Sequence, residues 1–297
     1  MNKKGVFFTI LTIALLSLLL VSYSMYSSIQ NREGITKRIK TMNNFVFSLE
    51  KDMTRQMYIA GFRTIFLLEK KIIDTGNPIY NLNASFQESM FNGTLNGEYQ
   101  ELMKGVTFNE ISEFLNERAR SVDLEISLSY PKIYVNQENP WTIRVNFETS
   151  MLIKDMSNLA SWNKTKVFVS YIPVENFEDP LYLINTDGKV ANRVNKTIYQ
   201  TFINGNDVSN LTKHSQNSYY IESSSGPSFL NRLEGKTSGD INGIESLVYL
   251  PEISSQGIPI KDKSSVDYIY FSDNNPVSCH IQGMPSWFKL DNAHLPT

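Results

Sequence analysis

The chain begins with an unbroken apolar run that covers residues 5–26. No charged side chain interrupts this run, and Lys3 and Lys4 stand directly before it. A helix of this length rises about 30 Å, which is the thickness of the hydrocarbon core of a bilayer. The pattern therefore predicts one transmembrane or signal-anchor helix at residues 5–26 that contacts membrane lipid, preceded by a cytoplasmic basic head at residues 1–4.

Residues 27–76 repeat apolar positions at steps of three and four. This spacing keeps one apolar stripe along a helical stalk, with its end at Gly76 and a break near Gly34. Four further apolar side chains make the stripe wider than a coiled-coil seam. We therefore expect the stalk to pack on the chain's own head, with pairing to a second copy as the alternative. The stripe consists of Ile35, Ile39, Met42, Val46, Leu49, Met53, Met57, Ala60, Thr64 and Leu67, flanked by Phe45, Ile59, Phe62 and Phe66.

The next two segments change from helical to alternating periodicity. Residues 77–121 predict a loop and then a helix over residues 107–121, where Thr107 and Glu110 form a capping box. Residues 122–175 alternate between apolar and polar positions, which indicates strands with one buried face. The alternation predicts an antiparallel β region with strands at residues 124–130, 143–153 and 167–171.

The pattern is less regular over residues 176–297, which predict a mixed strand and loop region in the same domain or a second one. A short helix is indicated where Pro227 stands at the first helical position and Gly235 follows the last one. The chain as a whole is predicted to be α+β: a single N-terminal transmembrane helix continues into a long amphipathic helix, followed by a mainly antiparallel β-rich head. Within residues 176–297 we expect a helix at 227–234, strands at 247–249 and 266–271, and loops at 204–226 and 235–243.

The first residues resemble a known kind of signal. The tripeptide KKG at residues 3–5, followed by VFF and a long apolar helix, is similar to the class III signal peptide of archaeal type IV pilins. The resemblance implies cleavage between Gly5 and Val6, after which the helix anchors the subunit and then packs in a filament core. Pilins often carry a glutamate five residues into the mature chain, where this sequence has Ile10. The remaining chain has a general resemblance to membrane-anchored archaeal surface proteins.

Two other fates of the N-terminus stay open. The apolar segment can remain as an uncleaved signal anchor, or a signal peptidase can cut after Ser24, where Ser22 and Ser24 give a small-x-small pattern. The count of flanking Lys and Arg favours the long part of the chain inside. The short basic head is nevertheless typical of a signal sequence, so we expect a single-pass cell-membrane protein with the bulk of the chain extracytoplasmic, at the cell surface.

Composition and charge exclude several classes of function. The net charge is −2, from 28 basic and 30 acidic residues, and no basic stripe marks the chain, so we expect no nucleic-acid partner. The single cysteine, Cys279, cannot form an intrachain disulfide. With only three histidines beside it, the chain has few side chains that could bind a transition metal. We therefore expect no cofactor and no metal ligand.

Motifs for catalysis are incomplete. Gly235-Lys236-Thr237 lacks the earlier glycine of a phosphate-binding loop, and Ser223–Ser228 lacks the strand-turn-helix context of a nucleophilic serine. A group of acidic residues is interpreted as solvated turn chemistry, and a group of aromatic residues mainly as core. We expect no catalytic and no cofactor-binding residue. The acidic group is Glu175, Glu178 and Asp179, and the aromatic group is Tyr219, Tyr220, Tyr268, Tyr270, Trp287 and Phe288.

Three hypotheses of function follow from these patterns. The first is a non-enzymatic, membrane-anchored surface protein, with a pilin-like structural or adhesive subunit as its sharpest form and a homo-oligomer or filament as its assembly. The second is a membrane-tethered ligand-binding ectodomain that acts with a partner, and the third is an exported enzyme. The sequence also has five sequons that permit glycosylation outside the membrane, at Asn83, Asn92, Asn163, Asn195 and Asn210.

Overall fold

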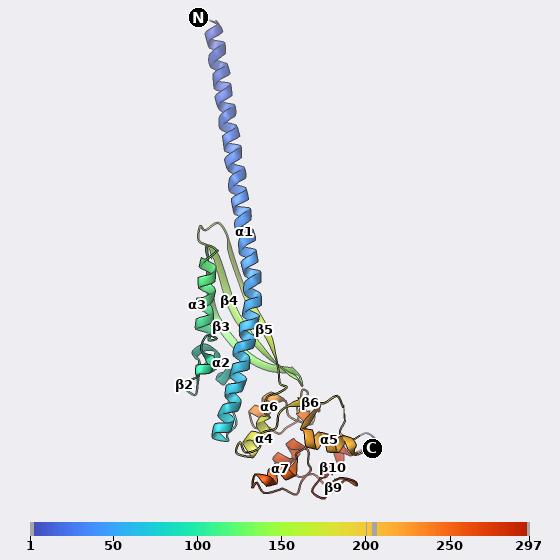
Figure 1. Cartoon of the computed structure of the whole chain (residues 1–297). Coiled ribbons are helices and arrows are strands. Elements are labelled where there is room, and N and C mark those ends of the chain that lie inside the picture. The colour runs from blue at the N-terminus through green and yellow to red at the C-terminus, as the bar shows by residue number, and fades with distance from the viewer. Residues whose placement is uncertain (1–2, 200, 204–206, 296–297) are drawn as a thin grey trace. The chain divides into compact units, whose positions relative to one another are not determined.

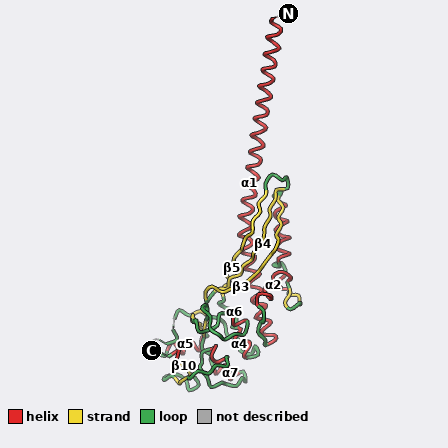
Figure 2. Tube along the Cα trace, turned by 180° about the vertical axis from the view of Figure 1, so that it is seen from behind, coloured by secondary structure: helices red, strands yellow, loops and turns green. Residues whose placement is uncertain are grey.

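The computed structural model describes residues 3–199, 201–203 and 207–295. It has the predicted α+β fold, with one long N-terminal apolar helix and antiparallel sheets (Figures 1 and 2). The chain divides into two units, and each is described by itself. The N-terminal unit consists of Met1–Asp52, Ser112–Ser129 and Ser150–Lys166, and the larger unit of Met53–Ile111, Tyr130–Thr149 and Val167–Thr297.

Helix α1 runs from Lys3 to Thr75 as one helix of 73 residues. The predicted break near Gly34 is wrong, because a single helical glycine costs only about 1 kcal/mol, which a helix of this length absorbs. The predicted end is confirmed. Gly76 adopts a φ of +65°, and its N–H donates to the carbonyl oxygen of Ile72 at 2.8 Å, which satisfies a carbonyl of the last turn.

The first part of α1 is the one helix, within the described residues, that is long and apolar enough to cross a membrane. An 18-residue window of it has a mean hydropathy of 2.1, and no part of that window is buried. From Phe7 to Tyr26 the large apolar side chains are exposed. A segment of this kind has no apolar neighbour within the described chain, as expected of a helix that meets lipid or another apolar surface.

The N-terminal unit buries part of the predicted stripe. Met42 and Leu49 of α1 are buried there, while Ile35 and Ile39 remain exposed. Ion pairs join α1 to the other segments of the unit, including Arg38 to Asp123 at 3.2 Å and to Asp155 at 3.6 Å. Two more pairs are Asp52 with Arg118 and Glu50 with Lys166.

The larger unit buries the rest of the stripe, from Met53 to Leu67, together with Ile65, Leu68 and Ile72. Gly61 marks the closest approach of α1 to the sheet, since a Cβ there would lie 2.6 Å from Ile172 and 3.0 Å from Val145. Two of the flanking residues that we expected to widen the buried face, Phe62 and Phe66, are instead 41% and 49% exposed. Packing on the chain's own fold is therefore observed, but along a narrower face than the sequence predicted.

Three strands form the main sheet in the order β3-β4-β5, joined by short connections (Figure 1). The strands are β3 (Leu124–Asn139), β4 (Thr142–Asp155) and β5 (Ser161–Pro173). In β5 the expected buried face is wrong, because Val167 and Tyr171 are exposed while Phe168 and Ile172 are buried. Strand β3 continues well beyond its predicted end at Tyr130. Tyr130 has a φ of +53°, and after it the buried positions change from even to odd numbers, as at a bulge. Pro131 is tolerated because β3 is an edge strand.

The predicted capping box of the second long helix is confirmed. Helix α3 spans Phe108–Arg120, and the N–H of Glu110 donates to Thr107 Oγ1 at 3.4 Å. In return, the N–H of Thr107 donates to Glu110 Oε2 at 3.2 Å. These reciprocal bonds satisfy backbone donors that a helix start otherwise leaves free. The preceding segment contains α2 (Leu82–Asn92), β1 (Thr94–Leu95), β2 (Glu98–Tyr99) and the 3-10 helix η1 (Glu101–Met103).

Several predictions for residues 176–297 are wrong. The expected loop at 204–226 contains α5 (Ser209–Asn217) and β7 (Tyr219–Glu222) among its described residues, and the expected strand at 266–271 is mostly helix α8 (Asp267–Phe271). The segment 247–249 makes one isolated bridge, between Leu247 and Val266. Short apolar runs have too few residues for their period to separate strand from helix. The other elements are α4 (Pro180–Asn185), β6 (Asn195–Lys196), α6 (Phe229–Leu233), β8 (Ile244–Glu245), α7 (Leu250–Ser255), β9 (Ser278–His280), β10 (Lys289–Asp291) and the 3-10 helix η2 (Asn292–His294).

A buried arginine connects these short elements. Arg232 of α6 is fully buried, and its Nη1 lies 2.6 Å from Asp179 Oδ2 and 2.8 Å from Asp267 Oδ2. Its Nη2 donates to the carbonyl oxygen of Ile244. Asp179, which we expected to be a solvated turn residue, is therefore part of the core; its carboxylate also accepts from the N–H of Leu181 at the start of α4. Removing one partner of such a cluster leaves a buried charge uncompensated.

Candidate functional site

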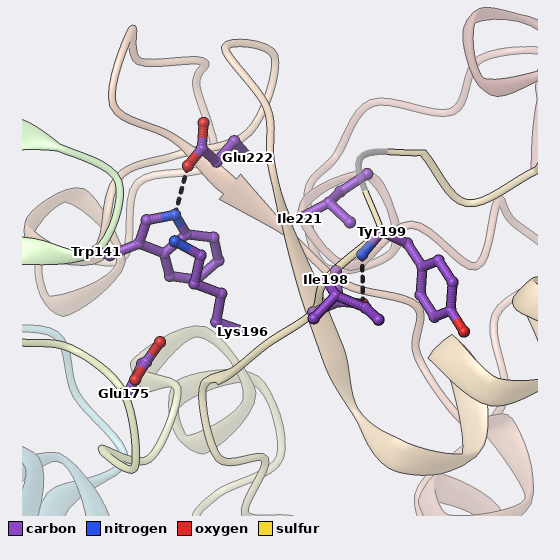
Figure 3. A pocket seen from close by; sticks show the side chains of 8 residues that line it. Trp141, Glu175, Lys196, Ile198, Tyr199, Ile221 and Glu222 are labelled. Carbon is purple, nitrogen blue, oxygen red and sulfur yellow. Dashed lines mark hydrogen bonds between the residues drawn. The ribbon is translucent and has the colours of Figure 1, made fainter.

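A hollow of about 660 Å³ in the larger unit is the best candidate for a site (Figure 3). This volume lies within the range of about 300–1,000 Å³ that is usual for small-molecule pockets. The hollow combines three charged side chains with aromatic and aliphatic ones. Its lining consists of Trp141, Glu175, Lys196, Thr197, Ile198, Tyr199, Ile221 and Glu222.

Different elements bring these residues together. Trp141 occupies the turn between β3 and β4, where its N–H donates to Asn139 Oδ1 at 2.9 Å and its carbonyl accepts from Val174 N–H at 3.0 Å. Lys196 belongs to β6, which pairs in parallel with β7, so that Lys196 lies opposite Tyr220. The backbone bonds therefore fix both walls of the hollow without using its charged side chains.

The polar groups of the hollow meet at the indole of Trp141. Its Nε1–H donates to Glu222 Oε1 at 2.5 Å, and the ammonium of Lys196 lies 4.9 Å from its ring centroid. A lysine at this distance from an aromatic face makes a cation–π contact. Figure 3 shows Lys196 beside the indole and Glu175 near it, without a dashed line to any labelled residue.

Tyr199 is held in the wall by a buried histidine. His214 of α5 is fully buried, and its ring centroid lies 5.7 Å from that of Tyr199, 5.2 Å from that of Phe202 and 5.7 Å from that of Tyr219. Burial lowers the pKa of His214, which keeps the ring neutral among these aromatic neighbours. The histidine therefore packs as part of the core.

A second hollow of about 400 Å³ adjoins the first, because Ile221 and Glu222 line both. Its other walls include Ser223, Ser225 and His294. The proximity of serine and histidine raises the question of a nucleophilic site. The sequence alone does not indicate this proximity, because these residues lie about seventy positions apart.

The hydrogen bonds of His294 argue against such a site. Nδ1 lies 2.9 Å from both carboxylate oxygens of Asp291, and Nε2 lies 3.2 Å from Glu245 Oε2. Burial opposes the charged ring, but these bonds outweigh it and raise the pKa of His294 to about 10. A doubly bonded imidazolium cannot take a proton from a serine, so His294 acts as a structural cation.

The remaining motif residues have structural roles. Ser228 is the N-cap of α6 and accepts from the N–H of Asn231 at 3.4 Å. Gly235, with a φ of +70°, follows that helix, and Lys236 pairs with Glu234 at 2.5 Å. Glu178 pairs with Arg193 at 2.8 Å, whereas Glu175 lines the first hollow. Of the aromatic group, Tyr220, Tyr270 and Phe288 are buried in the core, as predicted.

Four of the five sequon asparagines are exposed, and Asn210 of α5 is buried. Among the exposed four, Asn83 uses its Oδ1 to accept from the N–H of Val135 at 3.0 Å. Asn92, Asn163 and Asn195 are therefore the three sequons whose side chains are best placed to carry a glycan.

The candidate processing residues Gly5 and Val6 lie in the first turns of α1. Their side chains lie outside the described part of the chain. Among the described residues, no three His, Cys, Asp or Glu side chains come together as a metal site.

Comparison with known proteins finds no similar protein: no family model, no curated protein and no solved structure matches the chain. The class of protein is therefore defined by its own architecture, which is an α+β chain with one N-terminal helix able to span a membrane.

Proposed function

We propose that this chain is a non-enzymatic, membrane-anchored surface protein, and that it serves as a pilin-like structural or adhesive subunit. One observation carries the proposal: the 18-residue apolar window of α1 is not buried anywhere in the chain. Exposed apolar surface costs about 25 cal/mol per Å² in water. Lipid, and afterwards the apolar helices of neighbouring copies, would remove that cost.

The continuity of α1 supports the pilin-like form of the proposal. The helix passes without a break from its exposed apolar part into a part whose stripe is buried, at Met42 and Leu49 and again at Met57 and Ala60. A subunit that uses one helix first as an anchor and then as a filament core needs such a continuous rod. The large apolar side chains of Phe47 and Phe66 also remain exposed on α1, where neighbouring copies could cover them.

The mature N-terminus tests the pilin-like form. Mass spectrometry of the protein purified from its own membranes should find Val6 as the first residue. An intact start at Met1 would make the segment a permanent anchor, and a start at Met25 would make the chain a secreted protein. Either result would contradict the pilin-like proposal.

The single cysteine tests the sidedness. Cys279 lies in β9 and is exposed, so a membrane-impermeant maleimide should label it on intact cells. The variant Cys279→Ser controls for labelling of other proteins. Labelling that requires cell lysis would place the bulk of the chain in the cytoplasm and refute the proposed location.

A membrane-tethered ligand-binding protein is the second candidate. It draws support from the hollow at Trp141, whose charged side chains converge on a cavity of small-molecule size. An exported enzyme has less support, because both ring nitrogens of His294 are bonded to carboxylates.

A further inference from the structure

Unused hydrogen-bonding groups distinguish the hollow at Trp141 from an ordinary surface depression. Within the described chain, Glu175 has no hydrogen bond or ion pair, and Lys196 has no carboxylate within 4 Å. Glu222 uses one carboxylate oxygen, for the indole N–H of Trp141, and its other oxygen has no hydrogen bond to the residues that the structure describes. The hollow thus offers carboxylate acceptors and ammonium donors side by side.

Apolar surface lies between these groups. Ile198 is 91% exposed, and Ile221 and Tyr199 form the adjoining wall. A ligand that covers Ile198 would therefore bury apolar area while its polar edge reaches the charged side chains.

The balance of charge favours a neutral ligand. Two carboxylates and one ammonium give the lining a net charge of only −1, so the hollow does not strongly attract an anion or a cation. A hydroxyl group, by contrast, can donate to Glu175 or Glu222 and accept from Lys196. A sugar carries hydroxyls around its edge and C–H groups on its faces, which matches both the polar and the apolar parts of this lining.

We propose that the hollow at Trp141 binds a neutral carbohydrate, with Glu175, Lys196 and Glu222 as its hydrogen-bonding residues and Ile198 as its apolar contact. The second hollow extends the site, because it shares Ile221 and Glu222 with the first. It adds the hydroxyl groups of Thr201, Ser223 and Ser225 along its walls. Together the two hollows suit a disaccharide or longer chain better than a monosaccharide. The site goes beyond the proposed structural role and does not depend on it.

Calorimetric titration of the full-length protein in detergent tests the proposal. The probes are maltose, cellobiose, lactose and chitobiose, beside glucose and N-acetylglucosamine. At least one disaccharide should bind, and more tightly than its own monosaccharide. Glu175→Gln and Lys196→Gln should each weaken that binding by about tenfold, since each removes a charge-assisted hydrogen bond.

Exposed residues outside the hollow supply the matched controls. Glu113→Gln and Lys189→Gln make the same chemical changes at exposed positions and should leave binding unchanged. All four substitutions are at exposed side chains, so the variants should keep the circular dichroism spectrum of the parent. The proposal fails if none of the sugars binds, or if binding survives both Glu175→Gln and Lys196→Gln. It also fails if a free amino acid, which pairs with the same charges, binds where the sugars do not.

Discussion

At the scale of single residues, Glu69 carries a buried carboxyl group in the larger unit. The residue is 4% exposed, and its Oε1 has no hydrogen-bond partner within the described chain. Burial, reinforced by the negative charges of Glu178 and Asp179, raises the pKa of Glu69 to about 9. The folded chain therefore holds a proton on Glu69 at neutral pH that the unfolded chain releases.

This proton makes stability depend on pH. Between about pH 4.5 and about pH 9 the folded state binds more protons, so the free energy of unfolding falls as the pH rises. Glu69→Gln should remove that slope and stabilise the protein by roughly 2 kcal/mol at pH 7. Urea unfolding at several pH values measures the free energy of unfolding of the parent and the variant. Glu113→Gln, at an exposed position, is the control. A variant that retains the slope of the parent would show that Glu69 is ionised in the folded state.

The contribution of His294 to stability should decrease at high pH, whereas an ordinary buried histidine, which is neutral, destabilises the fold at low pH. The pKa of His294 is raised to about 10, so its contribution to stability is fully present below about pH 6.5 and is lost as the pH rises through about 10. His294→Gln should lower the free energy of unfolding by about 2 kcal/mol near pH 6. The difference should shrink above pH 10, and the exposed His280→Gln should change little at either pH. A constant difference at all pH values would refute the charged state.

At the scale of elements, two glycines of α1 make a matched pair. A Cβ on Gly61 would lie within 3.0 Å of Val145 and closer still to Ile172, whereas nothing lies within 4 Å of Gly34. Gly61→Leu should therefore lower the free energy of unfolding by about 2 kcal/mol through overpacking. Gly34→Leu should raise it, or leave it unchanged, because leucine favours the helix by roughly 0.8 kcal/mol. Chemical unfolding in detergent measures both, and equal effects would mean that α1 does not pack closely at Gly61.

At the scale of the whole molecule, the apolar start of α1 is the segment that we propose as the membrane anchor. Arginine at the centre of a membrane helix costs about 2.5–3.5 kcal/mol per residue. The double substitution Leu16→Arg and Leu19→Arg should therefore release the chain from membranes that are washed with alkaline carbonate. Phe47→Arg, at an exposed position beyond the apolar run, should leave it membrane-bound. If the double variant stays in the washed membranes, the segment is not the anchor.

The sequence by itself determined the elements whose signals are local and repeated. The long period of α1, its end at Gly76, the capping box of Thr107 and Glu110, and the alternation within β4 all appear in the structure. Each depends on neighbours within a few positions, or on a period that recurs over many residues, so the chain specifies it without reference to the rest of the fold.

Only the tertiary structure decided the burial of Asp179 and the candidate site. Asp179 was expected to be solvated, but in the core it forms an ion pair with Arg232, which lies 53 positions away in the sequence. Glu222 and Trp141, 81 positions apart, meet at the hollow through the pairing of β6 with β7 and the turn between β3 and β4. Contacts between such distant residues leave no periodic mark in a single sequence, because they arise only when separate elements pack together.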